Sequence, residues 1–360
     1  MRKNFIDNLR WICVLILIPY HTFMVYNNFG ESFYIKGADI TFAGIFIGIC
    51  WPWLMPLMFL IAGTSSAYAL KKRTTKEYAG ERVSRLLIPL LFGILLLVPL
   101  QTYFAEVYHN GYTGGYFQQY ILFFTKPTDL SGYNGGFTPA HLWFILYLFI
   151  ISMFALPLMG WYEKSEKKLR IEKITLPVLI ALFIIPVFSQ IILDIEGKSV
   201  GEYLTYFLFG YFLISNDVIQ EKLGKYRFLL LGLALPGMAV YIIWGRAIED
   251  FNFIPYELLY SFYAWTTILA ILGLGKRYLN FTNRAAGYLS EASFSIYIFH
   301  QQWVVITAFF AILFVDGLIL QILIVIAASY IFTFINYEIF KRLKFTGFMF
   351  GIKTKREKNI

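Results

Sequence analysis

The chain has 360 residues, of which 58% are hydrophobic, 20% aromatic and only 15% charged, and its formal net charge is +9 at pH 7. Its mean hydropathy of +0.62 excludes an ordinary soluble globular domain and places it among polytopic membrane proteins. The positive charge, which in a soluble protein would indicate a nucleic-acid partner, follows from membrane topology here. Cys13 and Cys50 lie in apolar segments, without the spacing of a disulfide framework or a metal site.

Ten apolar segments have the length and composition of membrane helices. They cover residues 11–29, 40–70, 86–104, 141–161, 174–193, 201–215, 228–245, 256–275, 292–313 and 317–340. The sequence therefore predicts an all-α, polytopic helical bundle with about ten transmembrane helices. We expect residues 1–345 to form the membrane domain and residues 346–360 a basic cytoplasmic tail.

Lysine and arginine alternate strongly between the connections of these segments. The N-terminus and every second connection hold 27 of the 31 basic residues, and the remaining connections hold four. Positive residues concentrate on the cytoplasmic side of membrane proteins. The distribution predicts a multi-pass protein of the cell (plasma) membrane with both termini in the cytoplasm.

The first segment carries Arg10 and His21, eleven positions apart and therefore on nearly the same helix face. At ~1.5 Å per residue they are roughly 16 Å apart along the axis, which puts Arg10 at the cytoplasmic interface and His21 beyond the midpoint. Ionisable residues inside membranes are functional candidates, although an interfacial arginine also snorkels and a buried histidine also serves as a core residue. Asp7 shares the face of Arg10 and either pairs with it or acts as a helix N-terminal acid.

The second segment, residues 40–70, contains Pro52 and Pro56, so we expect a kinked or broken helix whose freed carbonyls are covered by neighbours. The third begins after a basic loop, with Arg82 and Arg85 on one face near the membrane surface. Such arginines either set the topology or bind phosphates, because guanidinium groups bind phosphate bidentately at a helix start.

The connection over residues 105–140 is the longest and is expected outside. Its tyrosines and glycines fit two alternatives equally well. One is a lid that binds a polyol, and the other is an interfacial aromatic belt. The helix that follows opens with His141 and Trp143, for which a cap, a ligand contact and the aromatic belt are alternatives.

The ninth segment places Tyr297 and His300 on one stripe, with His300 near the midplane. A second deep histidine favours a polar interior to the bundle. By contrast, Glu202 and Glu257 begin the sixth and eighth segments, and we interpret them as helix N-terminal acids.

Five stretches of the chain together resemble the acyltransferase 3 family of integral membrane O-acyltransferases. They are DNLRWICVLILIPYHTFMVY, PLMFLIAGTSSAY, ERVSRLLIPL with the later VPLQTY, HLWFILYLFI and SFSIYIFH, in the family's order. The hallmark of the family, an arginine followed by ten residues and a histidine, falls on Arg10 and His21. Asp7, the proline before Tyr20 and the HLWF stretch make the chain most similar to the glucan succinyltransferase branch.

The resemblance implies transfer of an acyl group, of acetyl or succinyl type, from a cytoplasmic acyl-CoA to a hydroxyl of a glycan or similar acceptor. It implies that His21 is catalytic and that Arg82 and Arg85 support donor binding. It implies no tightly bound cofactor; the partners are acyl-CoA, the acceptor and the lipid bilayer, with no nucleic acid.

Residues and resemblance lead to one hypothesis. Cationic groups at the inner face, Arg10 among them, hold the phosphates of acyl-CoA, and His21, kept neutral by desolvation, serves as general base or transient acyl carrier. Tyr297, His300 and Trp143 are candidate oxyanion donors, and His141 a candidate substrate contact. The alternative is a proton-coupled transporter or exporter of a lipid or sugar, because broken helices and deep histidines also occur there.

Overall fold

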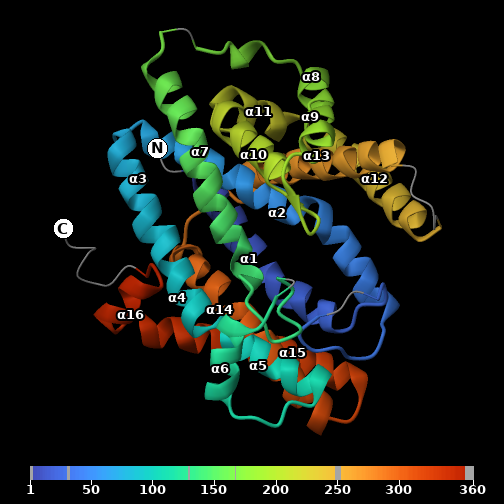
Figure 1. Cartoon of the computed structure of the whole chain (residues 1–360). Coiled ribbons are helices and arrows are strands. Elements are labelled where there is room, and N and C mark those ends of the chain that lie inside the picture. Colours follow the sequence, from blue (N-terminus) through green and yellow to red (C-terminus); the bar gives the residue numbers. More distant parts are fainter. Residues whose placement is uncertain (1–2, 31–32, 129, 167, 248–252, 353–360) are drawn as a thin grey trace. The chain divides into compact units, whose positions relative to one another are not determined.

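The computed structural model describes residues 3–30, 33–128, 130–166, 168–247 and 253–352. Over these residues the chain is built from helices, joined by one short antiparallel hairpin of β1 (Asp194–Ile195) and β2 (Lys198–Ser199) (Figure 1). The predicted all-α architecture is confirmed. Cys13 and Cys50 are both free and buried.

Eight helical stretches in the described part of the chain are long and apolar enough to cross a membrane. They are Asn4–Val25, Thr41–Leu70, Thr75–Asn110, Ala140–Lys164, Arg227–Trp244, Pro255–Tyr278, Arg284–Phe314 and Leu318–Phe340. The chain is thus a multi-pass membrane protein. The orientation of its termini stays a prediction.

The other two predicted membrane segments form shorter helices. Residues 174–193 divide into α8 (Leu176–Ala181) and α9 (Ile184–Ser189), while residues 201–215 form α10 (Val200–Phe209) and a π-helical turn, η4 (Gly210–Ile214). Pro186 explains the division, because it has no N–H to donate to the preceding turn and is tolerated in the first turn of α9.

The described residues group into two compact units, each assembled from separate stretches of the chain. The first contains the described residues of 1–10, 48–82 and 147–287. Its helices include α3 (Thr75–Arg82), α11 (Asp217–Lys225), α12 (Arg227–Ala247), α13 (Phe253–Tyr278) and most of α2 (Thr41–Leu70) and α7 (Trp143–Lys164). Both α11 and α12 pack against α13 (Figure 1).

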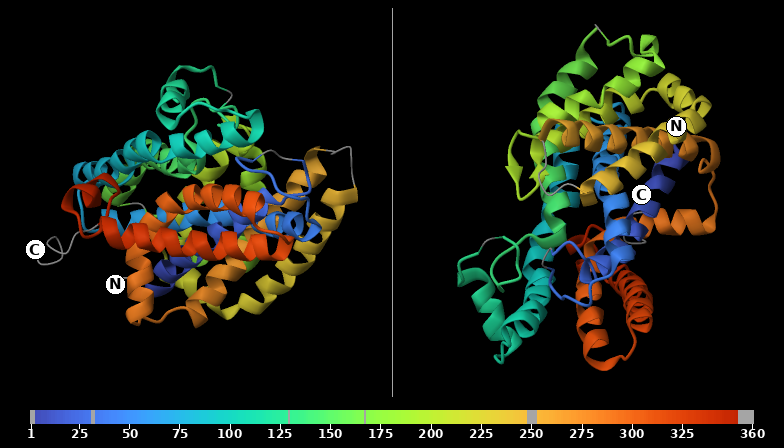
Figure 2. Two further views of the ribbon diagram at one scale, coloured as in Figure 1. Left: turned by 90° about the horizontal axis from the view of Figure 1, so that it is seen from below. Right: turned by 90° about the vertical axis from the view of Figure 1, so that its right-hand side faces the viewer.

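The second unit contains the described residues of 11–47, 83–146 and 288–360. Its elements are most of α1 (Asn4–Val25), the π-helical turn η1 (Val83–Leu87), α4 (Ile88–Leu96), α5 (Val98–Asn110), α6 (Tyr116–Thr125), the 3-10 turns η2 (Ala140–Leu142), most of α14 (Arg284–Phe314), α15 (Leu318–Phe340) and α16 (Lys344–Met349). α14 and α15 run side by side in both views of Figure 2. Trp303 stacks on Phe332 between them, and the Thr307 and Ser329 hydroxyls lie 3.0 Å apart.

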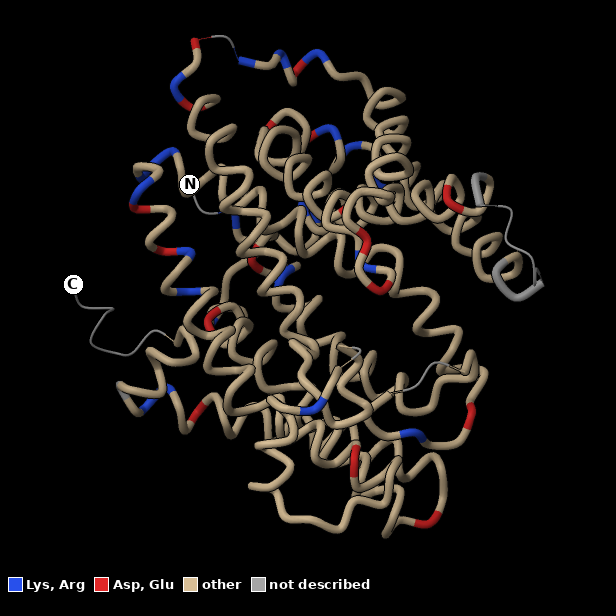
Figure 3. The backbone as a smooth tube through the Cα atoms, in the orientation of Figure 1, with Lys and Arg blue, Asp and Glu red and all other residues tan. Residues whose placement is uncertain are grey.

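Both units draw residues from the predicted membrane domain, whose limit at residue 345 stays a prediction. Of the predicted tail, residues 353–360 lie outside the described residues. Figure 3 shows the lysines and arginines of the first unit mainly on connections and short helices. Each membrane-length stretch has an 18-residue window with no more than two charged residues.

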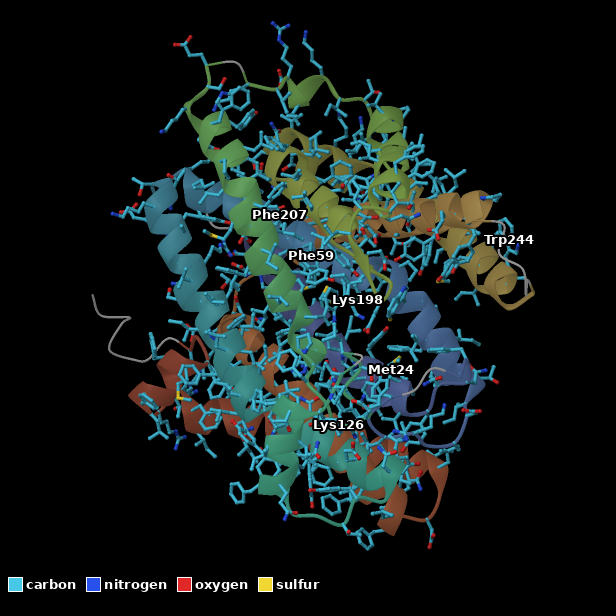
Figure 4. The ribbon with its side chains drawn as sticks, viewed as in Figure 1. Met24, Phe59, Lys126, Lys198, Phe207 and Trp244 are labelled. Carbon is cyan, nitrogen blue, oxygen red and sulfur yellow. The ribbon has the colours of Figure 1, made fainter. Side chains whose placement is uncertain are left out.

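The connection over residues 105–140 is itself folded within the second unit. After α6 the chain returns toward α5, where the Lys126 ammonium pairs with the buried Glu106 carboxylate, and the Gln119 side-chain amide donates to the Gly135 carbonyl at 2.8 Å. Lys126 is labelled in Figure 4. These contacts hold the connection to its own helices; whether it acts as a lid stays open as a prediction.

α2 is one continuous 30-residue helix through Pro52 and Pro56, so of the two expected alternatives, a kinked or a broken helix, the broken one is wrong. The prolines free the carbonyls of Gly48 and Pro52, whose coverage by neighbours stays a prediction. The Ile49 oxygen accepts both the indole N–H of Trp53 and the hydroxyl of Tyr263 at 2.7 Å. These donors stabilise the proline-containing stretch without interrupting it.

Two glycines let the backbones of α2 and α10 meet in the first unit. A Cβ on Gly63 would lie 1.9 Å from the Phe207 carbonyl oxygen, and one on Gly210 would lie 1.9 Å from the Leu60 carbonyl oxygen. Phe207 and the nearby Phe59 are labelled in Figure 4. This close approach fixes α2 just before its last two turns, where Ser65 and Ser66 lie.

We expect Gly63→Ala to lower the melting temperature of the detergent-solubilised protein. Overpacking of this kind costs about 1–3 kcal/mol because backbone atoms must move. Gly232→Ala is the matched control, because a Cβ there meets nothing within 4 Å, and alanine is the better helix former. Equal melting temperatures for the two variants, followed in detergent by intrinsic fluorescence, would show that the helices do not approach closely at Gly63.

Candidate active site

Arg10 is held at the start of α1 by a carboxylate and a hydroxyl. Its guanidinium donates to the Asp7 carboxylate at 2.9 Å and to the Ser65 hydroxyl of α2 at 2.7 Å, all within the first unit. The predicted pairing of Asp7 with Arg10 is therefore present. Because two of its donors are already directed, the guanidinium has a defined orientation rather than that of a freely snorkelling side chain.

Arg82 approaches the neighbouring serine of α2. Its guanidinium lies 3.4 Å from the Ser66 hydroxyl and stacks over the Tyr78 ring at 4.5 Å, while the Tyr78 hydroxyl donates to Ser66 at 2.8 Å. The Nε of Arg82 is buried and has no hydrogen-bond partner. The consecutive hydroxyls of Ser65 and Ser66 thus each contact one arginine, and we call these two arginines with their two serines the arginine–serine cluster.

The local sequence explains how Arg82 is placed. Thr74 and Glu77 form a capping box that starts α3, with the Glu77 amide donating to the Thr74 hydroxyl at 3.2 Å and the Thr74 amide donating to the Glu77 carboxylate at 2.8 Å. Tyr78 follows this capping box directly, and Arg82 lies one turn further along on the same face of the helix. Arg85 lies in the π-helical turn η1 and is exposed.

Three of the four histidines meet in the second unit. The ring centroids of His21 and His300 are 5.2 Å apart, and those of His141 and His300 are 5.1 Å apart. His21 also stacks on Phe33, with 5.9 Å between centroids. The histidine cluster, His21, His141 and His300, therefore joins α1, η2 and α14, which are far apart in sequence.

One turn of α14 anchors two of these histidines. His141 donates from Nε2 to the Ile298 carbonyl at 2.9 Å, and His300 donates from Nδ1 to the Tyr297 carbonyl at 2.6 Å. A carbonyl only accepts, so these ring nitrogens carry the hydrogens. The hydroxyl of Tyr297 donates to the His141 carbonyl as well.

Each histidine of the cluster has one ring nitrogen without a partner. Nδ1 of His21, Nδ1 of His141 and Nε2 of His300 are all buried without a hydrogen bond. Unpaired polar atoms are costly in an apolar interior and are uncommon in native structures. With the hydrogens of His141 and His300 directed to carbonyls, their free nitrogens are proton acceptors. This arrangement can receive hydroxyl donors from a ligand.

Backbone strain positions His141. Ala140 has a φ of +48°, in the left-handed region that a residue with a Cβ rarely adopts. Its amide is satisfied by the Thr138 hydroxyl at 3.0 Å. Strained residues of this kind gather at functional sites, where the surrounding structure holds them in place. The observed strain supports a functional position for His141.

The structure thus sorts the residues predicted from the sequence. It brings His21, His141, Tyr297 and His300 together, while the half-buried Trp143 begins α7 two residues after His141. It brings Asp7 and Arg10 together with Ser65, and Arg82 with Ser66. Their functional roles stay predictions.

Sequence analysis missed several polar residues of the two clusters. From the sequence we assigned no functional role to Ser65, Ser66 or Tyr78. In the second unit the Gln301 side chain, next to His300, donates to Gln101 at 3.1 Å with both residues buried. The consecutive glutamines after His300 are a signal that sequence reading can use, because amides deep in an apolar segment need partners.

Comparison with known proteins identifies the family. Residues 3–338 match the model of a family described as Acyltransferase domain. The chain belongs to this family of membrane acyltransferases. It is an O-acyltransferase, and this membership favours acyl transfer over the transporter alternative.

Several curated relatives match over nearly their whole length. The chain is 25% identical over 389 residues to a protein from Salmonella typhimurium named Glucans biosynthesis protein C. The alignment covers 99% of this chain and 97% of that protein. It is 24% identical over 383 residues to the proteins of the same name from Salmonella heidelberg and Salmonella schwarzengrund, covering 98% of this chain and 95% of each. The comparison with solved structures found no match.

We expect Ser65→Ala to lower kcat/KM for acyl transfer by roughly tenfold. The variant removes an acceptor from the Arg10 guanidinium, and a hydrogen bond to a charged group contributes about 1.5–3 kcal/mol. Steady-state rates of the purified protein in detergent measure the effect.

Ser152→Ala is the matched control, because the buried Ser152 hydroxyl bonds the Phe149 carbonyl of its own helix. If both serine variants retained full kcat/KM, the contact between Ser65 and Arg10 would have no role in the reaction.

Proposed function

We propose that this acyltransferase moves an acyl group from acyl-CoA to a hydroxyl of a glycan, with His21 as the general base. In this reaction the hydroxyl oxygen forms a bond to the acyl carbon as the thioester C–S bond breaks. The hydroxyl proton passes to the imidazole, and the leaving thiolate takes up a proton to give free CoA. The acyl group is of acetyl or succinyl type.

The unpartnered nitrogens of the histidine cluster carry this proposal. A general base must offer a free lone pair within hydrogen-bond reach of the proton that it removes. His21 and His300 each have a buried nitrogen without a partner, and their rings are 5.2 Å apart. An acceptor hydroxyl bound there would satisfy a nitrogen that the protein alone leaves unpaired, and His300 would help to orient it.

The arginine–serine cluster supports acyl-CoA as the donor. Arg82 has a buried, unpartnered Nε, and its side-chain charge is stacked on a neutral ring rather than paired with a carboxylate in the contacts above. Guanidinium groups bind phosphate bidentately, and CoA is rich in phosphate. Arg10 lies on the same helix as His21, roughly 16 Å away along its axis.

The names of the relatives support a glycan acceptor. Proteins called Glucans biosynthesis protein C match this chain from end to end, so one domain architecture is shared. We therefore assign a glucan or related glycan as the acceptor class. The predicted topology places His21 beyond the membrane midpoint toward the outer face, and Arg10 at the cytoplasmic face.

We expect His21→Ala to abolish acyl transfer while leaving expression and detergent elution unchanged. Loss of a positioned general base typically costs 10²–10⁴-fold in rate, as an order of magnitude. The measurement is acylation of a glucan acceptor by purified protein supplied with radiolabelled acetyl-CoA or succinyl-CoA.

The control for this variant is His109→Gln. His109 Nε2 donates to the Phe33 carbonyl at 2.8 Å, and a glutamine amide can replace that donor. Wild-type activity in His21→Ala would exclude His21 as the base.

We expect Arg82→Ala with Arg85→Ala to raise the KM for acyl-CoA roughly tenfold or more, since charge-assisted hydrogen bonds to phosphate are strong. Arg82→Ala alone should account for most of the change, because Arg82 belongs to the arginine–serine cluster and Arg85 is exposed. Titration with acyl-CoA at saturating acceptor measures this.

Arg342→Ala is the charge-matched control, because Arg342 is exposed and lies 3.8 Å from the Glu338 carboxylate. An unchanged KM in the double variant would return both arginines to a role in topology alone.

A further inference from the structure

A second group of unsatisfied polar side chains lies in the first unit, outside the residues used so far. Glu202 occupies the first turn of α10, where the Ser199 hydroxyl caps the helix by accepting the Glu202 amide at 3.1 Å. The position fits the N-terminal acid expected from the sequence, but the burial does not. Only 6% of Glu202 is exposed, and its Oε1 has no hydrogen-bond partner.

Tyr206 repeats this pattern one turn further along α10. Its side chain is 0% exposed, and its hydroxyl has no partner either. Residues four apart share one face of a helix, and the Glu202 carboxyl interacts electrostatically with the Tyr206 hydroxyl. Two buried polar groups therefore face the same side of α10 without being satisfied.

α13 supplies the other side of this group. Tyr260 interacts electrostatically with both Glu202 and Tyr206, and Glu257 interacts with Glu202. Both α13 residues are half-buried. The acceptor–donor cluster, Glu202, Tyr206, Glu257 and Tyr260, thus passes from fully buried side chains on α10 to partly exposed ones on α13.

Packing alone does not account for these side chains. A buried carboxyl and a buried phenol that lie on one face but leave polar atoms unpaired lose hydrogen bonds that water would give them. A phenylalanine at position 206 would fill similar space without that loss. A ligand with several hydroxyl groups would form hydrogen bonds with both the Glu202 carboxyl and the Tyr206 hydroxyl.

We infer that the acceptor–donor cluster is a subsite for a sugar ring of the acceptor glycan. Carboxylate oxygens accept from sugar hydroxyls, tyrosine hydroxyls both donate and accept, and tyrosine rings offer an apolar face to the sugar C–H groups. Two carboxyl groups oppose a phosphate or other anion. Among the described side chains, no three of His, Cys, Asp and Glu are arranged for a metal ion.

This inference rests on the proposed acyl transfer to a glycan, and it names where that glycan is recognised. Glu202 and Glu257 begin segments on the side that the lysine and arginine distribution assigns to the exterior. The subsite would contribute to the affinity for the acceptor and leave the acyl-CoA affinity unchanged. This split separates it from the arginine–serine cluster.

The test uses the full-length protein with Tyr206→Phe and, separately, Glu202→Gln. Titration of a soluble gluco-oligosaccharide at saturating acyl-CoA should give a KM for the acceptor raised roughly tenfold or more in each variant, with the KM for acyl-CoA unchanged. Tyr206→Phe removes a hydroxyl that bonds nothing in the protein, so it should keep or raise the melting temperature. It therefore keeps the test valid if Glu202→Gln does not fold.

A binding measurement separates this inference from the proposed function. In His21→Ala protein, which is expected to be inactive, the same oligosaccharide should change the intrinsic fluorescence, because Trp265 lies 6.0 Å from Tyr206 between ring centroids. The change should saturate, and it should require about tenfold more oligosaccharide when Tyr206→Phe is added.

Tyr288→Phe and Glu338→Gln are the matched controls. The Tyr288 hydroxyl donates to the Glu338 carboxylate at 2.8 Å, so these residues form a tyrosine–glutamate pair whose members already satisfy each other. An acceptor KM unchanged in Tyr206→Phe, with wild-type protein active on the glucan, would overturn the subsite alone. Wild-type protein that transfers no acyl group to any glucan would overturn the proposed function.

Discussion

The turn of α14 from Tyr297 to His300 is the contact on which the candidate catalytic centre depends. Its carbonyls accept one hydrogen from His141 and one from His300, and its tyrosine hydroxyl reaches the His141 backbone. In an apolar bundle each such bond is difficult to replace, because no water is present to compensate for its loss. The bonds fix which nitrogen of each ring stays free, and so they determine that His141 and His300 present acceptors.

The arginine–serine cluster and the acceptor–donor cluster, both in the first unit, differ in whether their buried polar atoms have hydrogen-bond partners. In the arginine–serine cluster the hydroxyls of α2 bond their own helix carbonyls and also contact the arginines, so the guanidinium groups are oriented. Close contact of α2 with α10 at Gly63 positions those serines. In the acceptor–donor cluster Glu202 Oε1 and the Tyr206 hydroxyl lack such partners. The first arrangement supports the proposed anion site, and the second supports the inferred sugar subsite.

Much of the fold could be predicted from the sequence, since hydrophobic length and the distribution of charge are local properties. The eight membrane-length helices follow the predicted segments, and the pairing of Asp7 with Arg10 follows from helix spacing. The division of residues 174–193 into two helices and the continuity of α2 could not be predicted from the sequence as readily. Both depend on how the helix around each proline packs against its neighbours, which the local sequence does not specify.

The sequence by itself determined the class of protein, the family pattern of Arg10 and His21, and the presence of further histidines at depth. These follow from periodicity and composition along single segments. Only the tertiary structure decided that His141 and His300 lie next to His21. It also decided that Ser65 and Ser66 accept hydrogen bonds from the arginines, and that Glu202 is buried beside Tyr206. The physical reason is that a helix pattern specifies which face a side chain occupies, whereas its hydrogen-bond partners come from other helices. Those partners are set by packing between segments that are far apart in the chain.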